Sequence, residues 1–174
     1  YSYKKLINNF QINNAFERHI FHKIALSNEI GESFLHFSNT DANIGTATLN
    51  SGFKNNNHND KQKIIIDRLD NLYDLKNQSI FIKIDVEGHE DKLIEGSLNI
   101  IKNNKVLMYL ETLNDSLLGK LKKMNFNIYY PSKTLNYPVY PFLRLIDSWQ
   151  PITKYNNYGN KIATLDYYHQ YLSI

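Results

Sequence analysis

The chain has 174 residues, of which 42% are hydrophobic, so it is long enough to bury a core and suits one domain. Its formal net charge is only +3, and its lysines and arginines are scattered among asparagine and acidic residues, which argues against a nucleic-acid partner. Cysteine is absent, which excludes disulfides and thiolate metal sites and fits a reducing cytosol.

The first third of the chain predicts one helix, two strands and a long loop. Apolar residues at helical spacing indicate an amphipathic helix that starts near Tyr3 and fades near Asn13. Residues 20–26 and 32–37 each alternate between apolar and polar side chains, so we expect the two arms of a hairpin. The polar segment 38–59 predicts a mobile loop.

The middle of the chain alternates between strand and helix patterns. A brief β-branched run and a short helix are expected first, and a buried strand, a helix, a second buried strand, a second helix and a third strand follow. These elements cover residues 64–66, 67–75, 80–84, 91–103, 106–110, 117–124 and 127–130. This alternation predicts an α/β fold with a parallel sheet.

The last part of the chain is aromatic and rich in proline. All four prolines lie between Pro131 and Pro151, so we expect no regular sheet there. Residues 129–149 are predicted to form a satellite core, and the alternative is an aromatic platform for a sugar acceptor. Residues 162–168 predict a final strand at the sheet edge, in antiparallel orientation.

The densest polar cluster follows the strand at residues 80–84. The segment Lys83 to Glu90 holds three carboxylates, one imidazole and Gly88 within eight positions. Ligands of open α/β sheets bind beyond the carboxyl ends of the strands, which favours a functional site. The alternative is structural, because acidic groups stabilise a helix N-terminus and glycine permits a tight turn.

The motif K-I-D-V-E-G-H-E at residues 83–90, followed by Gly96-Ser97, resembles the signature of the FkbM family of methyltransferases. Three further segments agree in order and spacing, and the resemblance spans Tyr1 to Glu111. These segments are Ile24 to Ser27 with Gly31, Asp67 to Leu72, and Leu110-Glu111.

The resemblance implies a Rossmann-like methyltransferase sheet, mostly parallel with an antiparallel edge strand, S-adenosylmethionine as methyl donor, and a hydroxyl acceptor such as a sugar. Family members also carry an upstream strand with a glycine-rich loop and a second strand ending in an acid, and neither is present here. We therefore expect residues 1–174 to be a single domain that lacks its first βαβ segment. A sequence that begins late, disorder upstream and a gene fragment all remain open as explanations.

The resemblance also implies roles for individual residues. Ala25, Leu26 and Ser27 would border the adenine, and Asp85 would lie nearest the methyl group. His89 would act as general base, because its ordinary pKa near 6.5 suits proton transfer at neutral pH. Glu87 would join Asp85 and His89 around the reaction centre.

A metal site is a further possibility at the same strand ends. Some related O-methyltransferases hold Mg²⁺ at the positions of Asp85 and Glu111, and oxygen ligands suit that ion. Each of these residues also has an ordinary alternative: a strand-to-turn step for residues 25–27, a solvent-facing histidine at a helix start, and acids that cap neighbouring loops.

Three functions compete at this point. The first is an O-methyltransferase for a sugar or similar small molecule or glycan, in polysaccharide synthesis. The second is a non-catalytic remnant or accessory domain that does not bind the cofactor alone. Nucleic-acid methylation is disfavoured, because the chain has neither a basic stripe nor an N-P-P-Y strand end.

No apolar run approaches the roughly 20 residues that cross a bilayer, so we expect a cytoplasmic protein.

Overall fold

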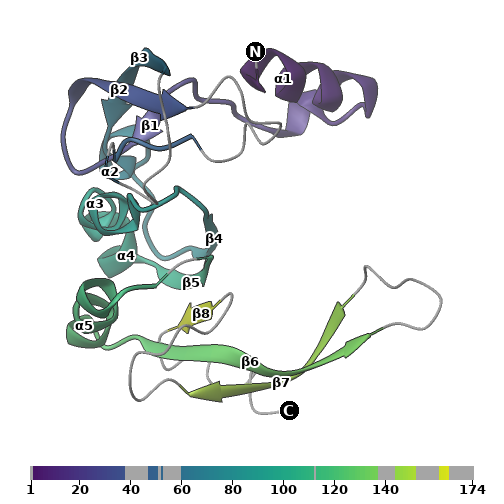
Figure 1. Ribbon diagram of the computed structural model, residues 1–174, viewed down its shortest axis with the longest axis vertical. Helices are drawn as coiled ribbons and strands as arrows, with labels where there is room; N and C mark the ends of the chain where they lie inside the picture. Colours follow the sequence, from purple (N-terminus) through teal and green to yellow (C-terminus); the bar gives the residue numbers. More distant parts are fainter. Residues whose placement is uncertain are drawn as a thin grey trace.

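The computed structural model describes residues 2–37, 47–50, 52, 60–111, 113–136, 144–151 and 161–164. The elements run from α1 at one end of the molecule to the β6–β7 hairpin at the other (Figure 1). In chain order they are α1 (Ser2–Ile12), η1 (Phe16–Arg18), β1 (Ala25–Leu26), β2 (Gly31–Phe37), β3 (Asp60–Asp67), α2 (Leu69–Leu72), β4 (Ser79–Ile84), α3 (Glu90–Glu95), α4 (Leu98–Asn103), β5 (Lys105–Leu110), α5 (Asp115–Lys123), β6 (Asn127–Asn136), β7 (Arg144–Pro151) and β8 (Lys161–Thr164).

The first sheet has the strand order β1-β3-β2 and corrects the predicted hairpin. β2 pairs antiparallel with β3, from Gly31 opposite Ile66 to Phe37 opposite Asp60, and β1 runs parallel to β3. Of the strand expected at residues 20–26, only Ala25–Leu26 is strand. The partner of a strand can be distant in sequence. Here β2 pairs with β3, which is rich in isoleucine and longer than β1.

The second sheet has the strand order β4-β5-β8-β6-β7. β4 and β5 pair in parallel along their whole length, as the sequence predicts. β8 is antiparallel to its neighbours, as predicted, but it lies between β5 and β6, so the predicted position at the sheet edge is wrong. Only one of the four described pairings in this sheet is parallel, so the prediction of a mostly parallel sheet is wrong for this part of the chain. α5 carries the chain from β5 to β6, and β8 fills the position between these two strands.

The proline-rich segment also departs from the prediction. β6 continues through Pro131 to Asn136 and pairs with β7, which is the last of the described strands in this sheet. The register shifts twice between Pro131 and Thr134. Proline lacks a backbone N–H and is tolerated where a ladder is irregular or at an edge, so sheet can form here. The part of the predicted final strand beyond Thr164, like most of the predicted loop at residues 38–59, lies outside the described residues.

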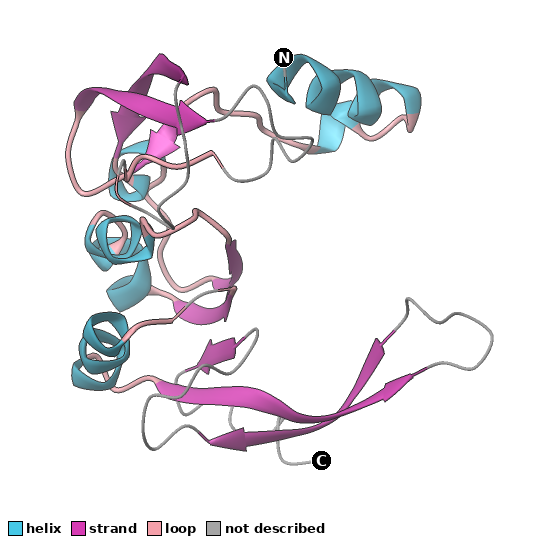
Figure 2. Ribbon diagram, viewed as in Figure 1, coloured by secondary structure: helices cyan, strands magenta, loops and turns pink. Residues whose placement is uncertain are grey.

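Helices α3, α4 and α5 lie on one side of β4 and β5 and close the core (Figure 2). The core is formed by apolar residues from these helices and from β4, β5 and the start of β6. Its most buried members are Ile84, Ile94, Val106, Met108, Leu110, Leu117 and Leu121. Tyr129 is buried and Tyr130 packs against this main core. The satellite core predicted for residues 129–149 stays a prediction, because the side chains of residues 131–149 lie outside the description.

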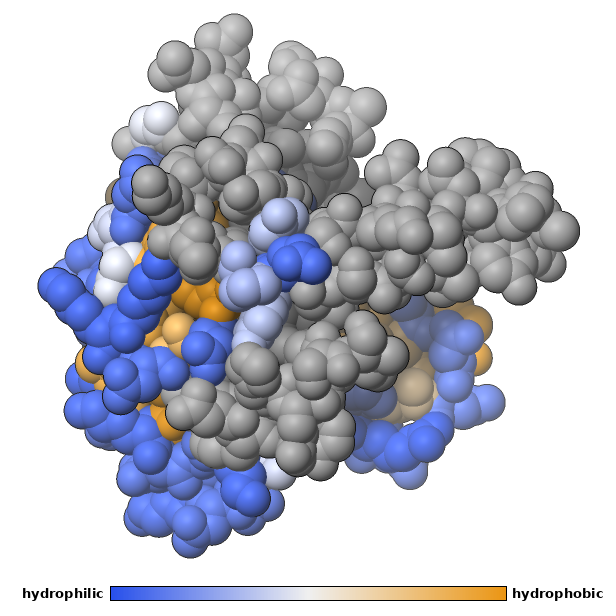
Figure 3. Space-filling model, turned by 90° about the horizontal axis from the view of Figure 1, so that it is seen from below, coloured by the Kyte–Doolittle hydropathy of each residue, from blue (hydrophilic) through white to orange (hydrophobic). Residues whose placement is uncertain are grey.

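Hydrophobic side chains also reach the surface. Phe81 on the edge strand β4 is 63% exposed and Ile65 on β3 is 56% exposed. Figure 3 shows apolar surface bordered by hydrophilic side chains on one face of the molecule. In the part of the chain that the structure describes, no helix has the length and hydrophobicity that a membrane crossing requires.

The single helix expected at residues 91–103 is broken at Gly96 and Ser97 into α3 and α4. A Cβ atom on Gly96 would lie 1.9 Å from the backbone oxygen of Ser27, so only glycine permits this contact. The Ser97 hydroxyl, which is fully buried, donates a hydrogen bond to the Leu93 carbonyl at 2.7 Å. The break therefore lets the turn after β1 pack directly against the helical layer.

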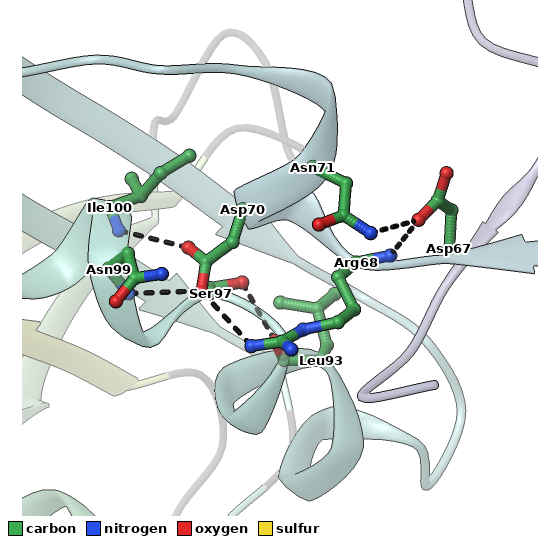
Figure 4. Close-up of polar contacts among 8 residues, drawn as sticks. All are labelled: Asp67, Arg68, Asp70, Asn71, Leu93, Ser97, Asn99 and Ile100. Carbon is green, nitrogen blue, oxygen red and sulfur yellow. Dashed lines mark hydrogen bonds and ion pairs between the residues drawn. The ribbon is translucent and has the colours of Figure 1, made fainter. Parts of the chain in front are cut away.

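Asp70 on α2 stabilises the start of α4 across a distance of 29 positions in sequence (Figure 4). Its carboxylate accepts hydrogen bonds from the backbone N–H groups of Asn99 and Ile100, both at 3.0 Å. The Asp70 side chain is 2% exposed and lies 3.5 Å from the guanidinium of Arg68. Its backbone N–H donates to the Gly96 carbonyl at 3.0 Å. Asp70, which lies beside the first sheet, thus accepts hydrogen bonds from N-terminal amides of α4 that have no partner within the helix, and α4 packs on the second sheet.

We predict that Gly96→Ala lowers the free energy of unfolding by about 1–3 kcal/mol or more, because the added methyl group collides with backbone that cannot rotate away. Gly119→Ala is the matched control. Gly119 lies inside α5 with nothing within 4 Å of an added Cβ, so alanine should stabilise by about 0.5–1 kcal/mol. Urea unfolding measures both values, and equal effects would contradict the packing argument.

Asp70→Ala should destabilise the fold by about 1–3 kcal/mol, since two amides at the start of α4 lose their acceptor. Asp74→Ala removes an aspartate whose side chain is 82% exposed and whose ion pair with Lys76 is solvated, so its effect should stay within about 0.5 kcal/mol. Thermal unfolding of the two variants side by side measures the difference. A loss as large for Asp74→Ala as for Asp70→Ala would refute the capping role.

Candidate functional site

The turn after β4 has a constrained backbone. Glu87 and Gly88 both have positive φ angles, of 47° and 88°. The Thr48 hydroxyl donates a 2.6 Å hydrogen bond to the Glu87 carbonyl, and Glu90, at 3% exposure, accepts one from the Gly88 N–H at 3.3 Å. A non-glycine residue with positive φ is uncommon and costs energy, so the surrounding contacts hold this turn in place.

Thr48 is a site residue that the sequence pattern does not reveal. It lies in the segment expected to be a mobile loop, yet it is 1% exposed and forms a bridge with His36 on β2. The prediction is wrong at this residue, because its buried hydroxyl finds a partner 39 positions away in the turn after β4. Sequence alone does not single out Thr48, because the partner of its hydroxyl is this distant in sequence.

Asp85 and Glu111 come together at the carboxyl ends of β4 and β5. Ile84 pairs with Leu110 in the parallel ladder, and the Glu111 N–H donates to the Ile84 carbonyl at 3.2 Å. The prediction that these two acids end adjacent parallel strands is confirmed. A hydrogen bond with Asp85 raises the pKa of Glu111, and desolvation and the Asp85 charge raise it further.

Lys83 partly neutralises this acidic pair. Its ammonium group lies 2.9 Å from Asp85 Oδ2, and this hydrogen bond raises the pKa of Lys83. Glu87 adds to the negative potential, since its charge also raises the pKa of Glu111. The charges of three carboxylates and one ammonium group therefore act near the strand ends, and the site carries surplus negative charge.

His89 and Ser27 form a second pair. His89 Nε2 lies 3.1 Å from Ser27 Oγ, and the Ser27 side chain is buried while the imidazole is half-buried. Burial lowers the pKa of His89 from its ordinary value of 6.5, the nearby Lys92 lowers it further, and Glu90 opposes both. The imidazole is therefore neutral at neutral pH, the state in which it accepts a proton.

A set of polar contacts extends from Ser27 into the helical layer. Ser27 Oγ donates to Asn28 Oδ1 at 3.4 Å, and Asn28 Nδ2 donates to Glu95 on α3 at 2.7 Å. Lys120 on α5 forms ion pairs with Glu95 at 2.7 Å and with Asp91 at 2.9 Å. No local pattern marks these residues, because Asn28 and Glu95 are 67 positions apart.

The other residues expected to contact the cofactor lie on β1. Ala25 and Leu26 are half-buried, and Leu26 packs against the core. The Ser27 N–H donates to the Asp67 carbonyl at 2.8 Å, which fixes the turn after the strand. Within the described ranges, no group of three or more histidine or acidic side chains is arranged to hold a metal ion. Asp85 and Glu111 alone would supply two carboxylates.

A parallel strand pair whose carboxyl ends hold the polar cluster is consistent with a methyltransferase-like α/β fold. A family model described as the methyltransferase FkbM domain matches residues 1–128 of the 174. The chain belongs to this family, as the sequence resemblance indicates. The match extends past Glu111, where the motif resemblance ends, to Ile128 in β6. No match was found among curated proteins or among solved structures.

We predict that His89 titrates below 6.5 and that Lys92→Met moves its pKa upward without restoring the ordinary value, because burial is the larger cause. Lys102→Met, at an exposed position on α4, is the control and should leave the His89 pKa unchanged. Nuclear magnetic resonance titration of the imidazole measures all three proteins.

The same shift has a consequence for stability. Since the folded-state pKa of His89 is depressed, the unfolded chain binds the proton more readily, and the stability that neutral His89 allows is lost as the pH falls below about 6.5. An imidazole that titrates above 6.5, or that ignores Lys92→Met, would contradict the assignment of causes.

Proposed function

We propose that this chain is an S-adenosylmethionine-dependent O-methyltransferase that acts on a hydroxyl of a sugar or a similar polyhydroxylated small molecule. Membership of the FkbM methyltransferase family supports the reaction class. The observation that supports the site is the turn after β4, where Asp85 lies beside Glu111 at the ends of parallel strands. Ligands of α/β sheets bind at this end.

The charge of the site fits the proposed cofactor. S-adenosylmethionine carries a sulfonium and an ammonium group, and the acidic pair has a raised Glu111 pKa that a cationic ligand would relieve. When bound, the cofactor supplies an electrophilic methyl group. We assign its binding to Asp85 and to the β1 end, Ala25, Leu26 and Ser27.

The protein's own task is then to place a hydroxyl oxygen and to remove its proton. His89 is the proposed general base, and its lowered pKa supports this role because the neutral imidazole is the form that accepts a proton. Asp85 and Glu87 are proposed to orient the reacting groups. The contacts of Thr48 and Glu90 support a fixed turn in which these side chains keep their positions.

A divalent cation is a second occupant to consider at the strand ends. The carboxylates of Asp85 and Glu111 are oxygen ligands that suit Mg²⁺, which would lower the pKa of the acceptor hydroxyl. Lys83 already supplies a cation 2.9 Å from Asp85, so the metal would have to compete with this ammonium group. The metal is therefore a secondary part of the proposal.

The sugar acceptor and a place in polysaccharide synthesis rest on the family resemblance. Most aromatic side chains of residues 129–149, the suggested acceptor platform, lie outside the described residues. We further propose a cytoplasmic location and no nucleic-acid substrate, which the absence of cysteine and of a basic stripe supports.

The alternative is a remnant or accessory domain that keeps the fold and does not bind the cofactor alone. Among the described strands β4 pairs with β5 alone, and Phe81 on β4 is 63% exposed. We propose that the first βαβ segment of a complete domain of this family pairs at this edge. Cofactor affinity would then depend on that segment being present.

Isothermal titration with S-adenosylhomocysteine separates the enzyme from the remnant. The enzyme predicts micromolar binding that Asp85→Asn weakens about tenfold, which corresponds to about 1.4 kcal/mol. Asp74→Asn, an exposed aspartate outside the site, is the control and should bind like the parent. Absence of binding supports the remnant, and methylation of a hydroxyl acceptor that EDTA leaves unchanged removes Mg²⁺ from the proposal.

A further inference from the structure

We propose that a directed chain of hydrogen bonds from Glu95 through Asn28 and Ser27 fixes the tautomer of His89. In this tautomer the proton is on Nε2, and Nδ1 carries the lone pair. Nδ1 is then the atom that takes the proton of the acceptor hydroxyl. The assignment of Nδ1 as the base rests on the proposed function, whereas the tautomer itself does not.

Glu95 sets the direction of the hydrogen bonds, because it lies at the end of the network that is farthest from His89. An ionised carboxylate only accepts hydrogen bonds, and Lys120, 2.7 Å away, lowers the pKa of Glu95 and keeps it ionised. Lys120 is itself held by Asp91 at 2.9 Å. Asn28 must therefore turn its NH₂ group toward Glu95, with Nδ2 at 2.7 Å from Oε2.

The orientation of Asn28 determines the rest. With Nδ2 committed to Glu95, Oδ1 faces the Ser27 hydroxyl at 3.4 Å and can only accept. Ser27 donates its single proton in that direction. Its oxygen then accepts from His89 Nε2, 3.1 Å away, and the 4% exposure of Ser27 limits competition from water.

A neutral imidazole has one N–H group, so a proton on Nε2 leaves Nδ1 unprotonated. Burial and Lys92 favour the neutral ring, while Glu90 opposes them. Ser27 and Asn28 are thus positioning residues, which act on the reaction through His89. The tautomer of a histidine follows from its hydrogen-bond network. Here the ionised Glu95 cannot donate a hydrogen bond, so the donors and acceptors of the network cannot exchange roles.

Glu95→Gln is the decisive variant, because glutamine can donate. Asn28 is then free to flip, and its NH₂ group can face Ser27, whose hydroxyl can donate to His89 Nε2. Long-range ¹H–¹⁵N spectra of histidine-labelled protein report the tautomer. We expect Nε2–H in the parent protein and a shift of population toward Nδ1–H in Glu95→Gln. Glu32→Gln is the matched control, because it alters an exposed ion pair with Lys63 and should leave the His89 spectrum unchanged.

Ser27→Ala gives a second measurement that does not depend on the ion pair of Glu95. The His89 Nε2–H proton should exchange with solvent slowly in the parent protein and faster once its acceptor is removed. An Nδ1–H tautomer in the parent overturns the proposal. Unchanged tautomer in Glu95→Gln together with unchanged exchange in Ser27→Ala also overturns it.

The result is separable from the proposed function. If the tautomer and both variants behave as expected but S-adenosylhomocysteine does not bind, the tautomer stands and the role of Nδ1 as a base is refuted. If the cofactor product binds and methyl transfer occurs, the pH profile of Glu95→Gln should shift relative to that of Glu32→Gln. An unshifted profile in an active Glu95→Gln variant with an altered tautomer refutes the base assignment alone.

Discussion

The contact between the backbone of Ser27 and Gly96 is the constraint on which the rest of the structure depends. It brings the turn after β1 within reach of the helical layer, and a side chain at position 96 would occupy the same space. The Asp70 carboxylate secures the neighbouring α4 at 3.0 Å from two of its amides. Together with the hydrogen bonds of Ser27 to His89 and of Asn28 to Glu95, these contacts join the three-stranded sheet to the second sheet.

The candidate site lies where this junction meets the end of β4. Ser27 can reach His89 because Gly96 admits the Ser27 backbone, and the same turn presents Asn28 to Glu95. The strand-end acids have a separate origin, since they follow from the parallel register of β4 and β5. The turn after β4 thus combines a neutral histidine with a surplus of negative charge, a combination that suits proton removal beside a cationic cofactor.

Membership of the FkbM family and the site geometry independently support the proposal of a methyltransferase. The family gives the reaction class, and the match from residue 1 to residue 128 includes both His89 and the strand-end acids. The geometry adds the partners of each group: Lys83 for Asp85, Ser27 for His89 and Thr48 for the backbone of Glu87. In our proposal, the contact with Ser27 also determines which nitrogen of His89 holds the proton.

The sequence by itself determined the family, the existence of most helices and strands, and the pairing of Asp85 with Glu111, because these follow from local periodicity and from the rule that parallel strands end at one edge. Only the tertiary structure decided the interior position of β8, the pairing of β2 with β3, the break at Gly96 and the burial of Thr48. The physical reason is the same in each case: the deciding contact joins residues far apart in sequence, and local composition does not record it.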